Sequence, residues 1–299
     1  MNSYNNNNSK NGLVLDQSAG NVNGTSETIR GASSVKRDKD LDYVAGVLDG
    51  DGNFDVRTSA KGLRILKSIR IKMSSRDTRV LSQVKKILGC GSIRAHVRLP
   101  TYHISTKVEM RRVVELLNGR IRLKTDNFAE SCKYFGIEFK EANYVIPENS
   151  TYLTGLIDTD GSVTYNFQRN VVCLDLEFKQ NIRSERLDFS GAIPGVTPKV
   201  QKLIKRNQTK DKIFYSIRFV FCPSVDCMIH IYNFAMKSRN YSDFKFYRLA
   251  QIKPFLEVRR FKNAIKGSDE HKIYSKWVLN FVSHLNPNPK LSYLNELTL

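Results

Sequence analysis

The chain has 299 residues, enough for one large domain or two of ordinary size with a substantial buried core. Lys and Arg outnumber Asp and Glu by 48 to 29, and the formal net charge is +19. A balance this basic indicates a polyanionic partner, most often nucleic acid, although a generic basic organellar or ribosomal-type protein has a similar composition. No apolar run approaches the ~18 residues of a membrane span, so we expect no membrane association.

Five cysteines are scattered along the chain, at Cys90, Cys132, Cys173, Cys222 and Cys227. An odd and scattered set predicts free thiols in a reducing compartment. The last two cysteines with the nearby histidine, residue 230, match no standard zinc spacing, so we expect buried thiols there and no metal site.

Residues 1–38 are rich in Asn, Ser and Gly and contain few large apolar residues. A segment of this composition cannot bury enough surface to offset the entropy of ordering it, so we predict a disordered tail. Folded structure is expected from residue 39 onward.

The first structured segment, residues 44–52, is a short apolar run that ends in Asp-x-Asp-Gly: Val-Ala-Gly-Val-Leu-Asp-Gly-Asp-Gly. Alternation of polar and apolar residues over 53–59 and 63–73 predicts a hairpin with one apolar and one cationic face. Apolar residues at helical spacing predict a helix over 80–88, ended by a glycine. The remaining predicted elements of this unit are strands at 92–98 and 101–106 and helices at 108–117 and 124–135.

Residues 153–161, Leu-Thr-Gly-Leu-Ile-Asp-Thr-Asp-Gly, repeat the first segment. The final aspartates are separated by 160 − 51 = 109 residues, which indicates that the chain contains two copies of one structural unit. Strands are predicted at 162–168, 172–179 and 212–221, with a helix from 225, whereas 184–198 resembles its counterpart poorly. After residue 254 the chain has no counterpart in the first copy, and a helix after Ser268 is expected to pack as a C-terminal appendage.

Small residues stand one helical turn apart in each copy, at Gly46 and Gly50 and at Gly155 and Thr159. This spacing lets two helix backbones approach closely, so the acids at their ends converge. Two converging carboxylates repel each other unless a cation lies between them. Mg²⁺ prefers oxygen ligands and bridges to phosphate, which favours metal-assisted phosphodiester hydrolysis over a merely helix-ending role for the pair.

The two motifs resemble the sequence that names the LAGLIDADG homing endonucleases, in their single-chain form with two repeats, over residues 40–250. The resemblance implies an α+β fold with tandem, pseudo-two-fold αββαββα repeats at 39–140 and 141–255, followed by an appendage at 256–299. Two antiparallel sheets would then form a saddle for DNA.

The resemblance also implies the site residues. The last acids, Asp51 and Asp160, would bind divalent metal and carry catalysis, and the preceding Gly50 and Thr159 join them as metal-binding candidates. The first acids, Asp49 and Asp158, are expected to be structural.

Two further kinds of catalytic residue follow from the resemblance. Lysines near the metal are expected at Lys124 and Lys237, because 124 − 51 = 73 and 237 − 160 = 77 are similar spacings. The polar residue that closes the second strand is Gln180, whereas the first copy has Met73 there, or Ser74 or Ser75 if the register differs by one.

Polar strand residues that face away from the core are the candidate readers of base edges, against the alternative of an ordinary solvated face. They are Asn53, Asp55, Arg57, Ser59, Arg64, Ser68, Arg70, Lys72, Arg94, His96, Ser162, Thr164, Asn166, Gln168, Asp175, Glu177 and Lys179. The two copies carry different readers, so the target is expected to be long and not palindromic.

The sequence therefore predicts a monomeric, Mg²⁺-dependent homing endonuclease that is encoded in a group I intron and makes a double-strand break in DNA. The alternative is an RNA maturase that assists splicing of its own intron, with or without DNA cleavage. A transcription regulator on the same scaffold is disfavoured by the retained acids, and an intein host by the two ends of the chain. Localisation in a mitochondrion or chloroplast is expected by family analogy alone.

Overall fold

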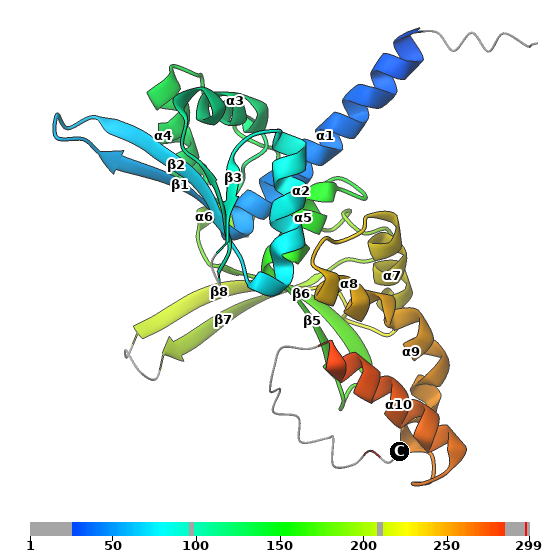
Figure 1. Cartoon of the computed structure of the whole chain (residues 1–299). Coiled ribbons are helices and arrows are strands. Elements are labelled where there is room, and N and C mark those ends of the chain that lie inside the picture. Colours follow the sequence, from blue (N-terminus) through cyan, green and yellow to red (C-terminus); the bar gives the residue numbers. More distant parts are fainter. Residues whose placement is uncertain (1–25, 96–98, 208–211, 285–296, 298–299) are drawn as a thin grey trace, which may run out of the picture. The chain divides into compact units, whose positions relative to one another are not determined.

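The computed structural model describes residues 26–95, 99–207, 212–284 and 297. The chain runs through two similar series of elements and a C-terminal extension (Figure 1). The first series is α1 (Ser26–Asp51), β1 (Gly52–Thr58), β2 (Arg64–Lys72), η1 (Ser75–Asp77), α2 (Thr78–Leu88), β3 (Ser92–Arg94), β4 (Thr101–Ile104), α3 (Lys107–Leu117) and α4 (Thr125–Phe135). The second is α5 (Thr151–Asp160), β5 (Gly161–Asn166), β6 (Val171–Lys179), α6 (Ile182–Arg186), β7 (Lys199–Asn207), β8 (Lys212–Val220), α7 (Cys227–Lys237) and α8 (Asp243–Ala250). The extension is α9 (Ile252–Val258), η2 (Arg259–Asn263) and α10 (Asp269–Ser283).

Each series builds one four-stranded antiparallel sheet, with strand orders β1-β2-β4-β3 and β5-β6-β8-β7. The two orders are the same when the second set is renumbered, so the duplication in sequence is also a duplication in topology. The predicted α+β class with two antiparallel sheets is confirmed. Each series contains the predicted αββαββα order and then one further helix, which is α4 in the first series and α8 in the second.

The first motif helix begins earlier than expected. Residues 26–38, which the composition predicted to be disordered, belong to α1. Once a helix has formed, each further residue adds one backbone hydrogen bond at little extra cost, so a helix anchored in the core propagates outward. The rest of the predicted tail, residues 1–25, lies outside the described residues.

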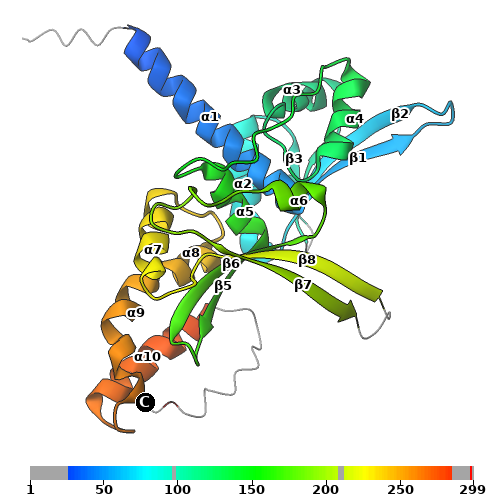
Figure 2. The ribbon, with the colours of Figure 1, turned by 180° about the vertical axis from the view of Figure 1, so that it is seen from behind.

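Helices α1 and α5 lie side by side between the two sheets, and each sheet begins where its helix ends (Figures 1 and 2). Two glycines make this approach possible. A Cβ added to Gly46 would lie 2.2 Å from the carbonyl oxygen of Tyr152, and one added to Gly155 would lie 2.4 Å from that of Tyr43. No other residue fits at either position without moving a backbone.

Helices cover one face of each sheet and complete the core. In the first copy α4 packs on the β1–β2 hairpin, where Phe128 meets Phe54 with ring centroids 5.2 Å apart. In the second copy Tyr165 of β5 is enclosed by aromatic rings of the C-terminal extension, Phe255, Trp277 and Phe281. The predicted C-terminal helix is present as α10, capped by the side chain of Ser268. Among the described residues, no helix combines the length and apolarity needed to span a bilayer.

A bulge in the first hairpin reverses which residues face the core. Asp55 pairs with Ser68, but Val56 pairs with Leu66, so Lys67 is the extra residue. Beyond the bulge, even-numbered residues of β2 face the helices. Arg64 consequently lies on the helix side, where it bonds Glu130 of α4 at 2.6 Å.

The second copy departs from the first between its second and third strands. The short helix α6 and an irregular segment occupy the poorly matching residues 184–198 and lead into β7. That strand, which the sequence did not predict, pairs with β8 along nine residues.

The closeness of α1 and α5 predicts the effect of a single methyl group. We expect Gly155→Ala to lower the free energy of unfolding by about 3 kcal/mol, because the new Cβ collides with backbone that cannot yield cheaply. Chemical denaturation of the full chain measures this change.

Gly191→Ala is the matched control, since a Cβ there meets nothing within 4 Å and the backbone is not left-handed. We expect it to leave stability unchanged or slightly raised. Equal stability of the two variants would contradict the packing of the motif helices described above.

Candidate active site

The predicted catalytic acids are the last residues of the two motif helices. Asp51 ends α1 and Asp160 ends α5, and a glycine begins the strand that follows each. A Cβ added to Gly50 would lie 2.0 Å from Thr159 Oγ1 and 3.0 Å from Asp160 Oδ2. The missing side chain at residue 50 therefore lets the two acidic ends meet, as the sequence predicted.

Burial and nearby charges raise the pKa values of both acids. Burial raises the pKa of Asp160 to about 6, and the neighbouring charge of Asp51 adds to the rise. Burial also raises the pKa of Asp51, although the charges of Lys245 and Lys124 oppose this. Within the described residues, neither carboxylate accepts a hydrogen bond or forms an ion pair.

The first acids of the motifs, in contrast, each accept several hydrogen bonds. Asp49 accepts hydrogen bonds from the backbone N–H groups of Arg122, Leu123 and Lys124 at 2.7–3.0 Å. These bonds fix the segment that leads into α4. Burial raises the pKa of Asp49 in spite of them.

Asp158 does the same for the segment that leads into α8. It accepts from the backbone N–H groups of Tyr241 and Ser242 and from the Asn240 side chain at 2.9–3.1 Å. Both first acids are at most 3% exposed, which agrees with the structural role expected for them.

Two tyrosines bind these acids across the helix pair. Tyr43 of α1 donates to Asp158, and Tyr152 of α5 donates to Asp49, both at 2.9 Å. Our sequence reading missed both. The two tyrosines are separated by 152 − 43 = 109 residues, the same spacing as the catalytic acids, and this equal spacing could have identified them.

Two half-buried lysines flank the acids, but only one is the residue predicted. Lys124 donates from Nζ to the carbonyl oxygens of Gly50 and Gly52 at the end of α1. Its counterpart is Lys245, which donates to the carbonyls of residues 157, 158 and 159 at 2.7–3.0 Å. Burial lowers the pKa of both ammonium groups, while the nearby carboxylates oppose that fall.

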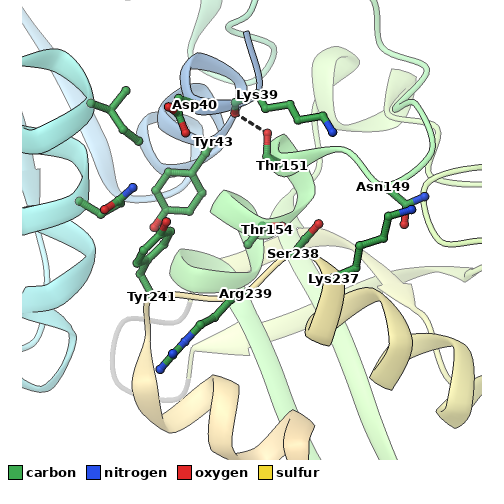
Figure 3. Close-up of a pocket in the computed structure, with 12 residues that line it drawn as sticks. Lys39, Asp40, Tyr43, Asn149, Thr151, Thr154, Lys237, Ser238, Arg239 and Tyr241 are labelled. Carbon is green, nitrogen blue, oxygen red and sulfur yellow. Dashed lines mark hydrogen bonds between the residues drawn. The ribbon is translucent and has the colours of Figure 1, made fainter. Parts of the chain in front are cut away.

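The prediction of Lys237 is wrong. Lys237 lines a separate cavity with Asn149 and Thr151 at the beginning of α5, whereas Asp160 is the last residue of that helix (Figure 3). The two repeats differ in length and chemistry here. In the second copy the lysine comes from the first turn of α8, three residues after the helix N-cap, and not from the N-cap itself.

The catalytic role of Gln180 stays a prediction, although this residue does not line the cavity beside Asp160. The Gln180 side chain donates to Glu185 at 2.7 Å, while its neighbours Lys179 and Asn181 line the cavity beside Asp160. Met73 holds the equivalent position in the first copy and is buried.

A third acid lies near the site on the side of the first copy only. Asp77 accepts a hydrogen bond from Ser242 at 2.5 Å, and its charge acts on the pKa values of both Asp51 and Lys245. The sequence reading did not single it out. The two halves of the site are therefore unequal.

A cavity of about 280 Å³ opens beside Asp160. Lys124 and Gly50 line it from the first copy, and Glu177 and Lys179 line it from the end of β6. Asp160 thus faces a space bordered by the end of β6.

The donor set suits magnesium better than a metal that needs a complete protein cage. Along the described part of the chain, no three His, Cys, Asp or Glu side chains gather to hold an ion. Mg²⁺ commonly takes one or two carboxylates and completes its shell with water and phosphate. Two converging carboxylates that form no ion pair among the described residues match that requirement, so Asp51 and Asp160 fit the ion.

The carbonyl oxygens of Gly50 and Thr159 are the less favoured candidates. Each already accepts a hydrogen bond from a half-buried lysine, although a carbonyl has a second lone pair. The five cysteines are free and buried, and burial raises the pKa of Cys222 to about 12, which agrees with the expected inert thiols.

The predicted readers of the first sheet fall into three groups. Asn53, Arg57, Arg70, Lys72 and Arg94 lie on the face away from α4, as their strand register requires. Asp55 shares this face but is held by Arg57 and Arg70 at 2.9 and 2.8 Å, which lower its pKa.

The remaining predicted residues of that sheet are not open to a ligand in the same way. Arg64 faces the helices because of the bulge, Ser68 is only 4% exposed beneath Asp55, and Ser59 accepts from Leu63 N–H within the turn. His96 lies outside the described residues.

In the second sheet, Ser162, Thr164 and Lys179 are exposed on the uncovered face. Glu177 is held by Arg218 and Lys205; burial opposes its ionisation, but these bonds prevail and lower its pKa to about 2. Asp175 is largely buried, and its Oδ1 has no partner among the described residues.

The last two predicted residues, Asn166 and Gln168, lie at the turn between β5 and β6. The Asn166 side chain accepts from the Arg169 backbone and closes that turn.

The uncovered faces also hold residues that the sequence reading missed. His103 of β4 pairs with Arg70, and Gln201, Arg218 and Lys205 belong to the long β7–β8 hairpin. The periodic alternation of β8 was visible in the sequence, but its register against β6 was not.

The raised pKa of Asp160 predicts how stability depends on pH. The folded state binds the Asp160 proton more tightly than the unfolded chain does, so stability falls as pH rises from about 4 to about 6 and the loss is complete above that range. We expect Asp160→Asn to stabilise the metal-free protein by ~1–3 kcal/mol at pH 7.5 and by little at pH 4.

Denaturation in chelator at the two pH values measures this difference. The exposed Asp226, changed to Asn, is the control for removing a negative charge. An equal gain in stability from Asp160→Asn at both pH values would show that folding does not raise the pKa of Asp160.

The sequence model of the LAGLIDADG endonuclease family matches residues 44–137. The chain is 26% identical over 140 residues to the intron-encoded RNA maturase bI4 of Saccharomyces cerevisiae, a match that covers 45% of this chain and 21% of the maturase. It is 23% identical over 292 residues to the probable intron-encoded endonuclease 4 of Neurospora crassa, covering 87% and 51%. The chain thus spans about a fifth and about half the length of these two relatives.

Two solved structures share the fold. The LAGLIDADG meganuclease I-AabMI, bound to uncleaved DNA, aligns with a TM-score of 0.50 at 14% identity and covers 83% of this chain and 99% of its own. The LAGLIDADG homing endonuclease I-GzeII, in complex with its DNA target, gives 0.50 at 13% identity, with 84% and 99% covered. The chain therefore carries the motif twice, with one sheet after each copy, and the model of the LAGLIDADG endonuclease family matches the first of these copies.

Proposed function

We propose that this protein is a site-specific homing endonuclease that hydrolyses both strands of a long, non-palindromic DNA target with the help of Mg²⁺. The observation that carries the proposal is the meeting of Asp51 and Asp160 where the two sheets begin, with no ion pair among the described residues and with a half-buried lysine on each side. A structural role alone gives no reason to hold two carboxylates together at this cost.

The metal site would be formed by Asp51 and Asp160. When bound, divalent ions would activate a water for attack on phosphorus and stabilise the leaving oxygen. The protein's own contribution is to hold the acids in a fixed place by means of the rigid helix pair, so that no reorganisation is needed during reaction.

The lysines act across the two halves. The charge of Lys124 lowers the pKa of Asp160 more than that of Asp51. The charge of Lys245 lowers the pKa of Asp51 more than that of Asp160. Each lysine is held in place by carbonyls of its own motif helix. In this position an ammonium group stabilises negative charge that develops on a scissile phosphate.

DNA would lie along the uncovered faces of the two sheets. The basic composition supplies the phosphate contacts, and paired carboxylates keep the arginines Arg57, Arg70 and Arg218 in defined orientations for base edges. The unpartnered oxygen of Asp175 is an acceptor suited to a base amino group. Because the two faces carry different side chains, the two half-sites of the target differ.

The second candidate is an RNA maturase that assists splicing of its intron. It is favoured by the similarity to the bI4 maturase, and it is compatible with nuclease activity. Retained catalytic acids favour cleavage, because RNA binding alone requires no metal-binding carboxylates.

The genomic origin, location and monomeric state of the protein are also part of the proposal. We infer an intron-encoded, organellar protein from the fungal intron-encoded relatives, acting as a monomer whose repeats, at 39–140 and 141–255, serve as internal half-sites.

The central test removes the negative charge of either acid. Asp51→Asn and Asp160→Asn are each expected to reduce cleavage by ~100-fold or more while DNA binding persists, since metal binding is lost and the sheets are untouched. The substrate is a plasmid that carries the junction at which the intron inserts, incubated with full-length protein and Mg²⁺ or with chelator.

Cleavage is followed on gels and binding by mobility shift. Normal cutting by both variants would place the chemistry elsewhere. Absence of cleavage by the wild-type protein, combined with restored splicing of its intron RNA, would favour the maturase.

A second test measures the part that Lys245 plays in cleavage. We expect Lys245→Met to lower the cleavage rate by ~100-fold, because the cation beside Asp51 is lost. Lys133→Met, which removes an exposed charge from α4, is expected to cut at the wild-type rate.

Thermal unfolding is measured in parallel, since Lys245 also binds three carbonyls. Full cleavage by a folded Lys245→Met variant would exclude a role for this lysine in the reaction.

A further inference from the structure

A second cavity lies at the opposite end of the motif helices from the acids (Figure 3). It measures about 240 Å³ and is lined by residues of α1, α2 and α5 and by the segment after α7. Since α5 has ten residues, this end is about 14 Å along the helix from Asp160. The proposed cleavage site uses none of its side chains.

The hydroxyl of Thr154 points to a missing partner in this cavity. Thr154 lines the cavity, is only 1% exposed, and its Oγ1 has no hydrogen-bond partner among the described residues. A helical threonine can bond a carbonyl of the preceding turn, as Thr159 does with Gly155 at 3.1 Å. A buried hydroxyl without a partner is costly, so its retention favours a ligand atom at this position.

The charges around the cavity favour an anion. Lys39 and Lys237 border it, and Figure 3 shows Lys237 beside Asn149 near the beginning of α5. Asp40 is the one acidic side chain in the lining, so the lysines outnumber it. The positive end of the α5 dipole also points to this end of the helix.

The corresponding positions of the first copy hold paired charges. There Arg120 forms ion pairs with Asp38 at 2.6 Å and Asp42 at 2.5 Å. Asp42 precedes Thr151 by 151 − 42 = 109 residues, and Ala45 precedes Thr154 by the same number. The second copy has Thr151 and Thr154 at the positions of Asp42 and Ala45, so it lacks this carboxylate and carries hydroxyls beside an open space.

We propose that this cavity binds a phosphate group, with Lys39 and Lys237 providing charge and Thr154 donating a hydrogen bond from its hydroxyl. The volume is below the ~300 Å³ at which pockets for drug-sized ligands begin, and it suits a phosphate or a phosphorylated sugar. The phosphate can belong to a free ion, a nucleotide or a nucleic-acid end. The shared chemistry is the tetrahedral oxyanion.

The test measures thermal stabilisation of the full-length protein by inorganic phosphate, with chloride at equal ionic strength as the reference. The wild type is expected to be stabilised in a saturable manner. Thr154→Val, which keeps the shape and removes the hydroxyl, should weaken binding by about tenfold while the free protein becomes equally or more stable. Lys237→Met should weaken binding similarly, whereas the exposed Lys133→Met should not.

Parallel titrations with a mononucleotide and with a 5′-phosphorylated oligonucleotide identify the source of the phosphate, since the preferred ligand binds most tightly and loses most in Thr154→Val. Absence of saturable stabilisation by any of the three would overturn the proposal. So would binding that Thr154→Val and Lys237→Met leave unchanged, because the anion would then be bound elsewhere on this basic protein.

Discussion

The contact between the two motif helices is the constraint on which the rest of the structure depends. Gly46 and Gly155 let the backbones approach until a methyl group would collide with a carbonyl on the other helix. Tyr43 and Tyr152 then cross the contact to the first acid of the opposite motif. Because those acids also hold the segments before α4 and α8, the same contact fixes the helices that cover both sheets.

This rigidity is what allows two like charges to stay together. Burial and mutual repulsion disfavour the ionised form of Asp160, and an isolated pair of flexible side chains would simply separate. Here the acids are helix ends, so they cannot move apart without breaking the glycine contact. The lysines relieve part of the repulsion, but they are bound to carbonyls and leave both carboxylates free for a cation.

Periodicity and repetition in the sequence were sufficient to predict the two copies, the first hairpin of each copy and the meeting of Asp51 with Asp160, because these follow from spacing along a helix or strand, whereas the two complete sheets were predicted from the family resemblance and β7 was missed. Arg64 was placed on the wrong face because a bulge shifts the alternation by one residue, and nothing local in the sequence marks it. Lys245 was missed because the repeats reach the same point in space from different positions in the chain. Which residue of the second copy supplies the lysine depends on tertiary geometry and not on its position in the repeat.

The two copies are alike where they touch each other and unlike elsewhere. The glycines, tyrosines and aspartates of the contact recur at a constant spacing of 109, whereas Asp77, Met73 and the phosphate cavity have no equal in the other half. The β7–β8 hairpin extends over nine residues per strand, against three and four in β3 and β4. A duplicated protein needs symmetry only at the seam that assembles its shared site, so each outer surface was free to acquire its own ligand contacts. That division explains how a nearly two-fold centre can serve a proposed target that is not itself two-fold.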